Sequence, residues 1–220
     1  MIVEQNNEEM GSEEIMNEAS ESKKEITTQE AKPSFWKNYF NSLKLDTRSI
    51  ARNAIIAAVY VALTYAFFFT SYGTPQVRIS EFMVLLAFFN PNYIYGLTIG
   101  ALLSNIYSPA FAVVCSPLDI VFGTLASFLA ATCISLSRHM FIATIFPCIF
   151  NGLLLGLEFG VINPFPEGSW ALFWVNFGWV FLGEVIAVSV LGYIVFMILS
   201  KRLKNFNKIV SATQNLKYRW

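Results

Sequence analysis

The chain has 220 residues, of which 55% are hydrophobic and 16% aromatic, and its fifteen acidic and fifteen basic side chains give a formal net charge of +0. Only eight charged residues lie between positions 50 and 200, a composition that is typical of a membrane protein and excludes an ordinary soluble domain. No nucleic-acid partner is expected.

Residues 1–33 form an acidic segment with nine glutamates and few large apolar side chains. Such a segment cannot bury enough surface to offset the entropy lost on ordering, so we expect a disordered tail. It also lacks the basic patch and short apolar stretch of a cleavable signal. The first apolar segment is therefore expected to stay in the protein.

Residues 34–48 contain an aromatic pattern with helical spacing. One face of such a helix would carry Phe35, Trp36, Tyr39, Phe40 and Leu43. This pattern predicts a short amphipathic helix at the membrane interface. An unstructured linker is the alternative.

Six apolar segments follow, and a membrane-spanning helix needs about 20 apolar residues. The predicted spans are 50–71, 79–89, 94–106, 118–136, 141–159 and 178–199. The second and third are short, so they are either tilted or longer than their apolar runs. Trp170, Trp174 and Trp179 are expected to mark the membrane interface before the sixth span.

These segments predict an all-α integral membrane protein, with a bundle of six transmembrane helices over residues 49–204 and a cytoplasmic tail over 205–220. Basic residues precede the first span, separate the fourth from the fifth and follow the sixth: Lys37, Lys44, Arg48, Arg52, Arg138, Lys201, Arg202, Lys204 and Lys208. With six spans all of them lie on one side. The positive-inside bias makes that side, and both termini, cytoplasmic.

Polar side chains collect at the opposite, outer ends of the predicted spans: Arg78, Glu81, Asn105, Asp119 and Glu158. Asn151 lies near the middle of the fifth span, and Glu184 lies six residues, or about 9 Å, into the sixth. Ionisable groups within membrane helices are costly and indicate a functional site. The alternatives are an interfacial Arg78–Glu81 ion pair and a purely structural role for Glu184.

An outward-facing bowl lined by these side chains would suit a small, flat, polar ligand with several hydrogen-bond donors. A carboxylate can accept two parallel donors from a guanine-like edge, and aromatic faces can hold a ring or a cation.

Small residues form stripes on three predicted helices. The first span carries Ala54, Ala58, Ala62 and Ala66 at four-residue spacing. The fifth carries Gly152, Gly156 and Gly160, and the third carries Gly96 and Gly100. Such stripes let helices approach closely. We expect the glycines to pack inside the bundle, whereas the alanines serve either internal packing or docking to another membrane protein.

Several motifs are absent from the sequence. It has no GxxxxGK[ST] pattern, so it does not hold ATP in that way. It has no HExxH or GxSxG, and its single histidine, His139, lies beside Arg138 at the predicted cytoplasmic boundary. Cys115, Cys133 and Cys148 lack CxxC spacing and are expected to be buried apolar residues. We therefore expect no enzyme activity, no metal and no cofactor.

Five stretches carry a resemblance to a known family: 76–81 (QVRISE), 96–105, 118–123 (LDIVFG), 150–152 (FNG) and 183–184 (GE). With them the chain, from about residue 51 to 204, resembles the substrate-binding S components of energy-coupling-factor (ECF) transporters. The similarity is greatest to the queuosine-precursor (QueT) family.

The resemblance implies a six-helix protein of the bacterial plasma membrane that binds its substrate from outside. Its partners would be a transmembrane coupling subunit and two ATPase subunits. Docking on the coupling subunit would use the alanine stripe of the first helix, and transport would involve rotation of the S component in the bilayer.

The implied substrate is a 7-deazaguanine such as preQ1. Glu184 or Asp119 would read the guanine edge, Glu81 or Glu158 would meet the aminomethyl cation, and Asn105 and Asn151 would add hydrogen bonds. Arg78 would orient Glu81. The alternatives are an S component for another vitamin or nucleobase, a self-sufficient secondary transporter, which the lack of a visible inverted repeat disfavours, and an intramembrane enzyme that uses the outer carboxylates.

Overall fold

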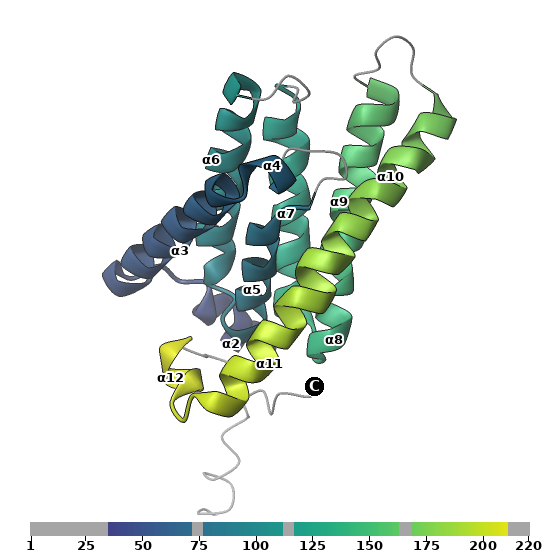
Figure 1. Ribbon diagram of the computed structural model, residues 1–220. Coiled ribbons are helices and arrows are strands. Elements are labelled where there is room, and N and C mark those ends of the chain that lie inside the picture. The colour runs from purple at the N-terminus through teal and green to yellow at the C-terminus, as the bar shows by residue number, and fades with distance from the viewer. Residues whose placement is uncertain (1–34, 72–76, 112–116, 163–168, 211–220) are drawn as a thin grey trace, which may run out of the picture. The chain divides into compact units, whose positions relative to one another are not determined.

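The computed structural model describes residues 35–71, 77–111, 117–162 and 169–210 (Figure 1). These residues form helices and no β-strand. The chain divides into two units, Met1–Asn41 and Ser42–Trp220. The predicted disordered tail, residues 1–33, lies outside the described residues. Helix α2 (Phe35–Ser42) lies within the predicted 34–48 segment.

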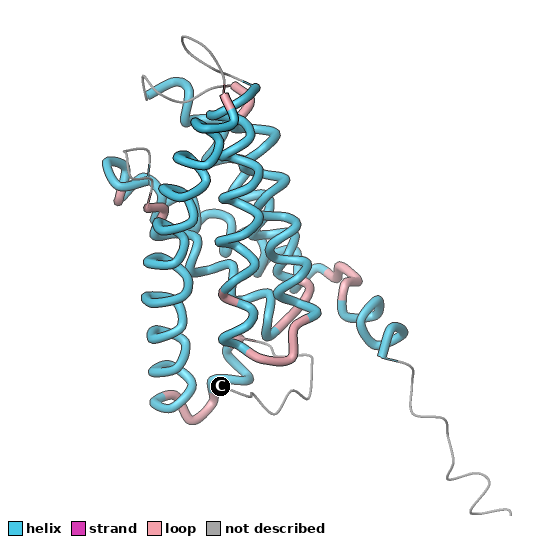
Figure 2. The backbone as a smooth tube through the Cα atoms, turned by 90° about the vertical axis from the view of Figure 1, so that its right-hand side faces the viewer, coloured by secondary structure: helices cyan, strands magenta, loops and turns pink. Residues whose placement is uncertain are grey.

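The second unit begins with two long helices, α3 and α6, and the shorter helical segments between them. Its first elements are α3 (Thr47–Ala66), α4 (Phe68–Ser71), the 3₁₀ helix η1 (Ile79–Leu85), α5 (Leu86–Phe89) and α6 (Tyr93–Phe111). The third span, predicted to end at residue 106, therefore continues as a helix to Phe111. In the turned view the helices of this unit run side by side (Figure 2).

The remaining elements form three further helical stretches. They are α7 (Asp119–Leu136); α8 (Met140–Ala143), α9 (Ile145–Leu157) and the π-helix η2 (Glu158–Ile162); and α10 (Trp170–Glu184), the π-helix η3 (Val185–Gly192) and α11 (Tyr193–Arg202), followed by α12 (Phe206–Ile209). Among the described residues, four stretches are long and apolar enough to cross a membrane: Thr47–Ala66, Asp119–Leu136, Met140–Ile162 and Trp170–Arg202. Two apolar helices are shorter, Ile79–Phe89 and Tyr93–Ile106.

The last long helix begins earlier than predicted. The sixth predicted span starts at residue 178, and the tryptophans before it are predicted to mark the membrane interface. The helix itself, α10, starts at Trp170. The Ser169 hydroxyl caps it by accepting a hydrogen bond from the backbone N–H of Leu172 at 3.2 Å, and such a cap fixes a helix start. Trp170 and Trp174 therefore stand on the helix itself, with exposed side chains.

Helix α3 also has a well-defined start. Asp46 and Ser49 form a capping box in which the Ser49 N–H donates to the Asp46 carboxylate at 2.9 Å. The hydrogen bonds from Ser49 lower the pKa of the Asp46 carboxyl. An ionised carboxylate at this position also interacts favourably with the positive end of the helix dipole.

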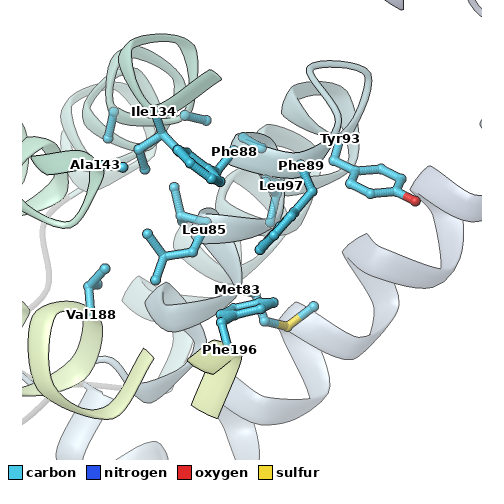
Figure 3. Packing of buried hydrophobic residues seen from close by; sticks show 14 of the residues in the cluster. Met83, Leu85, Phe88, Phe89, Tyr93, Leu97, Ile134, Ala143, Val188 and Phe196 are labelled. Carbon is cyan, nitrogen blue, oxygen red and sulfur yellow. The ribbon is translucent and has the colours of Figure 1, made fainter. Parts of the chain in front are cut away.

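The short segment η1–α5 lies at the centre of the apolar core. Val84, Leu85, Ala87, Phe88 and Phe89 are fully buried. Figure 3 shows Leu85, Phe88 and Phe89 packed among side chains from the surrounding helices. With about 2.0 Å of rise per 3₁₀ residue the segment spans only about 20 Å, less than the bilayer core. Its irregular backbone is tolerated because protein, and not lipid, surrounds it.

The glycine stripes pack inside the bundle, as predicted. A Cβ on Gly96 would lie 2.6 Å from the backbone oxygen of Asn53, and one on Gly100 would lie 2.9 Å from Tyr60. Gly152 and Gly156 contact Phe177 in the same way. The glycines thus let α6 approach α3, and α9 approach α10.

Replacing Gly96 by alanine should destabilise the protein by about 1–3 kcal/mol, because the new methyl group would overlap Asn53 backbone atoms that cannot move freely. Gly178→Ala is the matched control, since no atom lies within 4 Å of the Cβ position there. Thermal unfolding in detergent micelles measures both. Equal stability of the Gly96→Ala variant and the wild type would contradict the close approach of α3 and α6.

Candidate functional site

The carboxylate of Glu81 on η1 is buried, and its partners are side chains from two other helices and Arg78 at the start of η1 itself. The Tyr60 hydroxyl on α3 donates a hydrogen bond to its Oε1 at 2.5 Å, and the Ser127 hydroxyl on α7 donates to the same atom at 3.3 Å. The Arg78 guanidinium lies 3.8 Å from this oxygen. A buried carboxylate is stable only with such partners.

The carboxylate of Glu184 is also buried. Because the helical stretch starts at Trp170, Glu184 lies about 21 Å along the helix from its beginning. The Asn151 amide on α9 donates a hydrogen bond to Glu184 Oε1 at 2.7 Å. The π-helix η3 begins at the next residue, and π-helical segments are frequent at functional sites.

Glu81 and Glu184 line one cavity together with Arg78 and Asn151, closed by the apolar side chains of Leu155 and Val180. The two carboxylates lie within electrostatic range of each other and of Arg78. Four predicted site residues are thus brought together here. The cavity volume of about 10 Å³ is that of about one water molecule, so a purine-sized ligand requires the surrounding helices or side chains to move.

In each of these two carboxylates one oxygen accepts hydrogen bonds and the other does not. No described residue donates a hydrogen bond to Oε2 of Glu81 or Oε2 of Glu184, and both atoms are buried. With one arginine beside two carboxylates, the cluster carries an excess of negative charge when both are ionised. The site can therefore accept hydrogen-bond donors and a positive charge.

Asp119 and Glu158 form a second acidic group. Asp119, the first residue of α7, and Glu158, the first residue of η2, are both buried and lie within electrostatic range of each other. Within the described parts of the chain no donor reaches either oxygen of Glu158. Neither residue lines the Glu81–Glu184 cavity.

Asn105 on α6 is fully buried and lies between these two groups along α7. Its amide donates to the Thr124 hydroxyl at 3.4 Å, and its nitrogen occupies the space that a Cβ on Gly123 would take, 2.6 Å away. Asp119, Gly123 and Ser127 succeed one another at four-residue spacing on one face of α7. The polar contacts of Asn105 and Glu81 with α7 and the Asp119 carboxyl thus follow one another over about 12 Å of this helix face.

The alanine stripe lies on the outer surface of the bundle. Ala54, Ala58, Ala62 and Ala66 are all exposed. The opposite face of α3 is buried and carries Asn53, Ala57, Tyr60 and Thr64. The alanines therefore do not take part in internal packing of the described residues.

Two groups of polar residues were missed from the sequence. Tyr60 and Ser127 hold Glu81, and a hydroxyl cluster lies next to them, with Thr64 2.7 Å from Ser80 and 3.3 Å from Ser104. Their signal is the helical spacing of Asn53, Tyr60 and Thr64 in the first span, which marks its inward face.

The described residues contain no group of three or more side chains suited to hold a metal ion. Cys148 is buried, as predicted, whereas Cys133 is half-buried. Cys115 lies outside the described residues.

Two comparisons with known proteins identify the family of this chain. A model of the QueT transporter family matches residues 50–201. The queuosine precursor transporter QueT of Lactococcus lactis subsp. cremoris is 45% identical over 67 residues, which are 30% of this chain and 40% of that relative. The aligned part thus spans less than half of the relative. No solved structure matches the chain.

The family match covers most of the chain, including both carboxylate groups. A transporter family accounts for the several long apolar helices, and it sets aside the intramembrane enzyme. The chain is a multi-pass membrane protein that belongs to the QueT transporter family.

Proposed function

We propose that this chain is the substrate-binding S component of an ATP-driven ECF importer, and that it takes up a queuosine precursor such as preQ1. The similarity to a queuosine precursor transporter supports the substrate class. The main structural support is the pair of buried carboxylates, Glu81 and Glu184. Each has one oxygen to which no described residue donates a hydrogen bond. A 7-deazaguanine with an aminomethyl group supplies both the donors and the cation for such a pair.

Glu184 is the stronger candidate for reading the guanine edge, with Asp119 as the alternative. Asn151 donates a hydrogen bond to one oxygen of Glu184 and so fixes that carboxylate. Asn151 would also supply a further hydrogen bond to the ligand. A carboxylate held in this way can accept parallel donors, and such charge-assisted hydrogen bonds are strong.

Glu81 or Glu158 would meet the ligand's ammonium group. Arg78, 3.8 Å from Glu81, would orient that carboxylate, and Asn105 would contribute from the Asp119 side. Because two carboxylates flank one guanidinium in the cavity, a cationic ligand lowers the cost of burying these charges.

The membrane arrangement is part of the proposal: six helices over residues 49–204 in the bacterial plasma membrane, with both termini cytoplasmic, an interfacial helix within 34–48 and a cytoplasmic tail over 205–220. The short segment η1–α5 counts as the second of the six. Its burial inside the bundle accounts for its being shorter than a bilayer.

The partners would be a transmembrane coupling subunit and two ATPase subunits, which supply the nucleotide-binding motif that this sequence lacks. The exposed stripe of Ala54, Ala58, Ala62 and Ala66 supports docking, because small side chains on a helix surface let a partner helix approach closely. Rotation of the docked subunit would carry the site across the bilayer.

Replacing Glu184 by glutamine should weaken preQ1 binding about 10- to 100-fold, because the guanine donors lose a charged acceptor. The measurement is a titration of the purified chain followed by tryptophan fluorescence, with queuine, guanine, riboflavin and thiamine as comparison ligands. Asn176→Ala, on the exposed face of the same helix, should bind like the wild type. Unchanged affinity in Glu184→Gln would remove this residue from the site, and no binding of any 7-deazaguanine by the folded wild type would overturn the substrate.

Replacing Ala58 by tryptophan should abolish uptake while preserving ligand binding by the isolated chain. The indole ring would keep a partner helix away from α3, whereas the site lies on the opposite face. Uptake is measured in vesicles that contain the chain, the coupling subunit and both ATPases. Val121→Trp, at an exposed position on α7, controls for bulk on the bundle surface. Normal uptake with Ala58→Trp would contradict docking through this stripe.

Vesicles that contain this chain alone should show no preQ1 uptake, either with or without an ion gradient. Gradient-driven uptake by the chain alone would instead identify a secondary transporter.

A further inference from the structure

A second cavity, of about 230 Å³, lies away from the carboxylate site at the end of the bundle where α3 and α6 begin and α11 ends. One wall consists of Arg52, Ile55 and Ile56 on α3. The facing wall includes Leu86 of α5 and Val210, which follows α12. Helix α12 is at the lower left of Figure 1, at the same end as the start of α3. The cavity is an apolar groove with one permanently charged group.

The groove is held together by a specific contact. The Tyr93 hydroxyl at the start of α6 donates a hydrogen bond to the backbone oxygen of Val210 at 2.8 Å, and both residues are buried. This bond joins positions 117 residues apart and fixes the end of the described chain against the bundle. Both walls are therefore parts of the folded structure.

Along α3 the charged side chain comes first and the apolar side chains follow, in the order in which the headgroup and the acyl chains succeed each other in a phospholipid. Arg52 lies about one helical turn, or about 5 Å, nearer the helix start than Ile55 and Ile56. Ile55 is 63% exposed, so the apolar part of the groove opens to the surface of the bundle, which in a membrane protein faces acyl chains.

The surroundings are strongly basic. Within the described residues of the second unit, this end of the bundle carries eight basic side chains: Lys44, Arg48, Arg52, Arg138, Lys201, Arg202, Lys204 and Lys208. The one acidic side chain described there is Asp46, which lies within electrostatic range of Arg52. Basic pockets between membrane helices attract anionic lipid headgroups.

We propose that this groove is a binding site for an anionic phospholipid, with the phosphate on the Arg52 guanidinium and one acyl chain along Ile55, Ile56 and Leu86. Guanidinium groups bind phosphate oxygens in a bidentate geometry. The apolar walls of the groove would shield the acyl chain of the lipid from polar groups. The acidic segment 1–33 of this chain fits less well, because it is rich in glutamate and poor in large apolar side chains.

The test is native mass spectrometry of the full-length chain in mild detergent, titrated with phosphatidylglycerol and with phosphatidylcholine of identical acyl chains. We expect one phosphatidylglycerol to bind at least about fivefold more tightly than phosphatidylcholine, the size expected of one basic side chain at a lipid headgroup. Arg52→Gln should remove this preference. Ile56→Trp, which fills the groove, should weaken binding of both lipids.

Lys204→Gln is the matched control, because Lys204 is an exposed base at the same end that does not line the groove. It should keep the preference of the wild type. Tryptophan fluorescence and thermal unfolding establish that each variant is folded, and Arg52→Lys, which keeps the charge, should retain most of the preference if Arg52→Gln is unstable. Equal binding of the two lipids by the wild type, or a preference that survives Arg52→Gln, would overturn the proposal and indicate another occupant, such as residues 1–33 or an apolar partner helix.

Discussion

The buried carboxylate of Glu81 is the interaction on which the arrangement of this bundle depends. It belongs to a short 3₁₀ segment that could not cross a bilayer alone, and it binds Tyr60 of α3 and Ser127 of α7. A carboxylate in an apolar interior is very costly unless hydrogen-bond donors or a positive charge lie beside it. The helices that provide them are thereby fixed around η1, and the apolar core forms around the same segment.

The core and the site are adjacent parts of one element. Leu85, Phe88 and Phe89 fill the centre of the bundle, while Arg78 and Glu81 at the other end of the same segment line the cavity. The core therefore sets the depth and orientation of the carboxylate. A change in core packing near Leu85 is transmitted to the site through a rigid, buried piece of backbone.

Hydropathy and helical spacing predicted the class of the protein, most helix positions and the identity of the buried polar residues. The last helix begins at Trp170, before the predicted span that starts at residue 178, because Ser169 caps the helix there, and hydropathy does not detect such a cap. The partners of the carboxylates could not be predicted. Asn151 meets Glu184 across 33 residues of sequence, and such pairing depends on which helices become neighbours. The Tyr60 contact has a signal in the sequence, because Asn53, Tyr60 and Thr64 recur at helical spacing on the inward face of the first span.

The two cavity carboxylates belong to different parts of the chain. Glu81 receives its described hydrogen bonds from residues within 47–136, and Glu184 receives its own from α9, which packs tightly on α10 through Gly152, Gly156 and Phe177. A ligand held by both carboxylates therefore acts as a noncovalent cross-link between the first and second halves of the bundle. Ligand occupancy would then set how firmly these halves hold together, since binding to the folded state alone stabilises it.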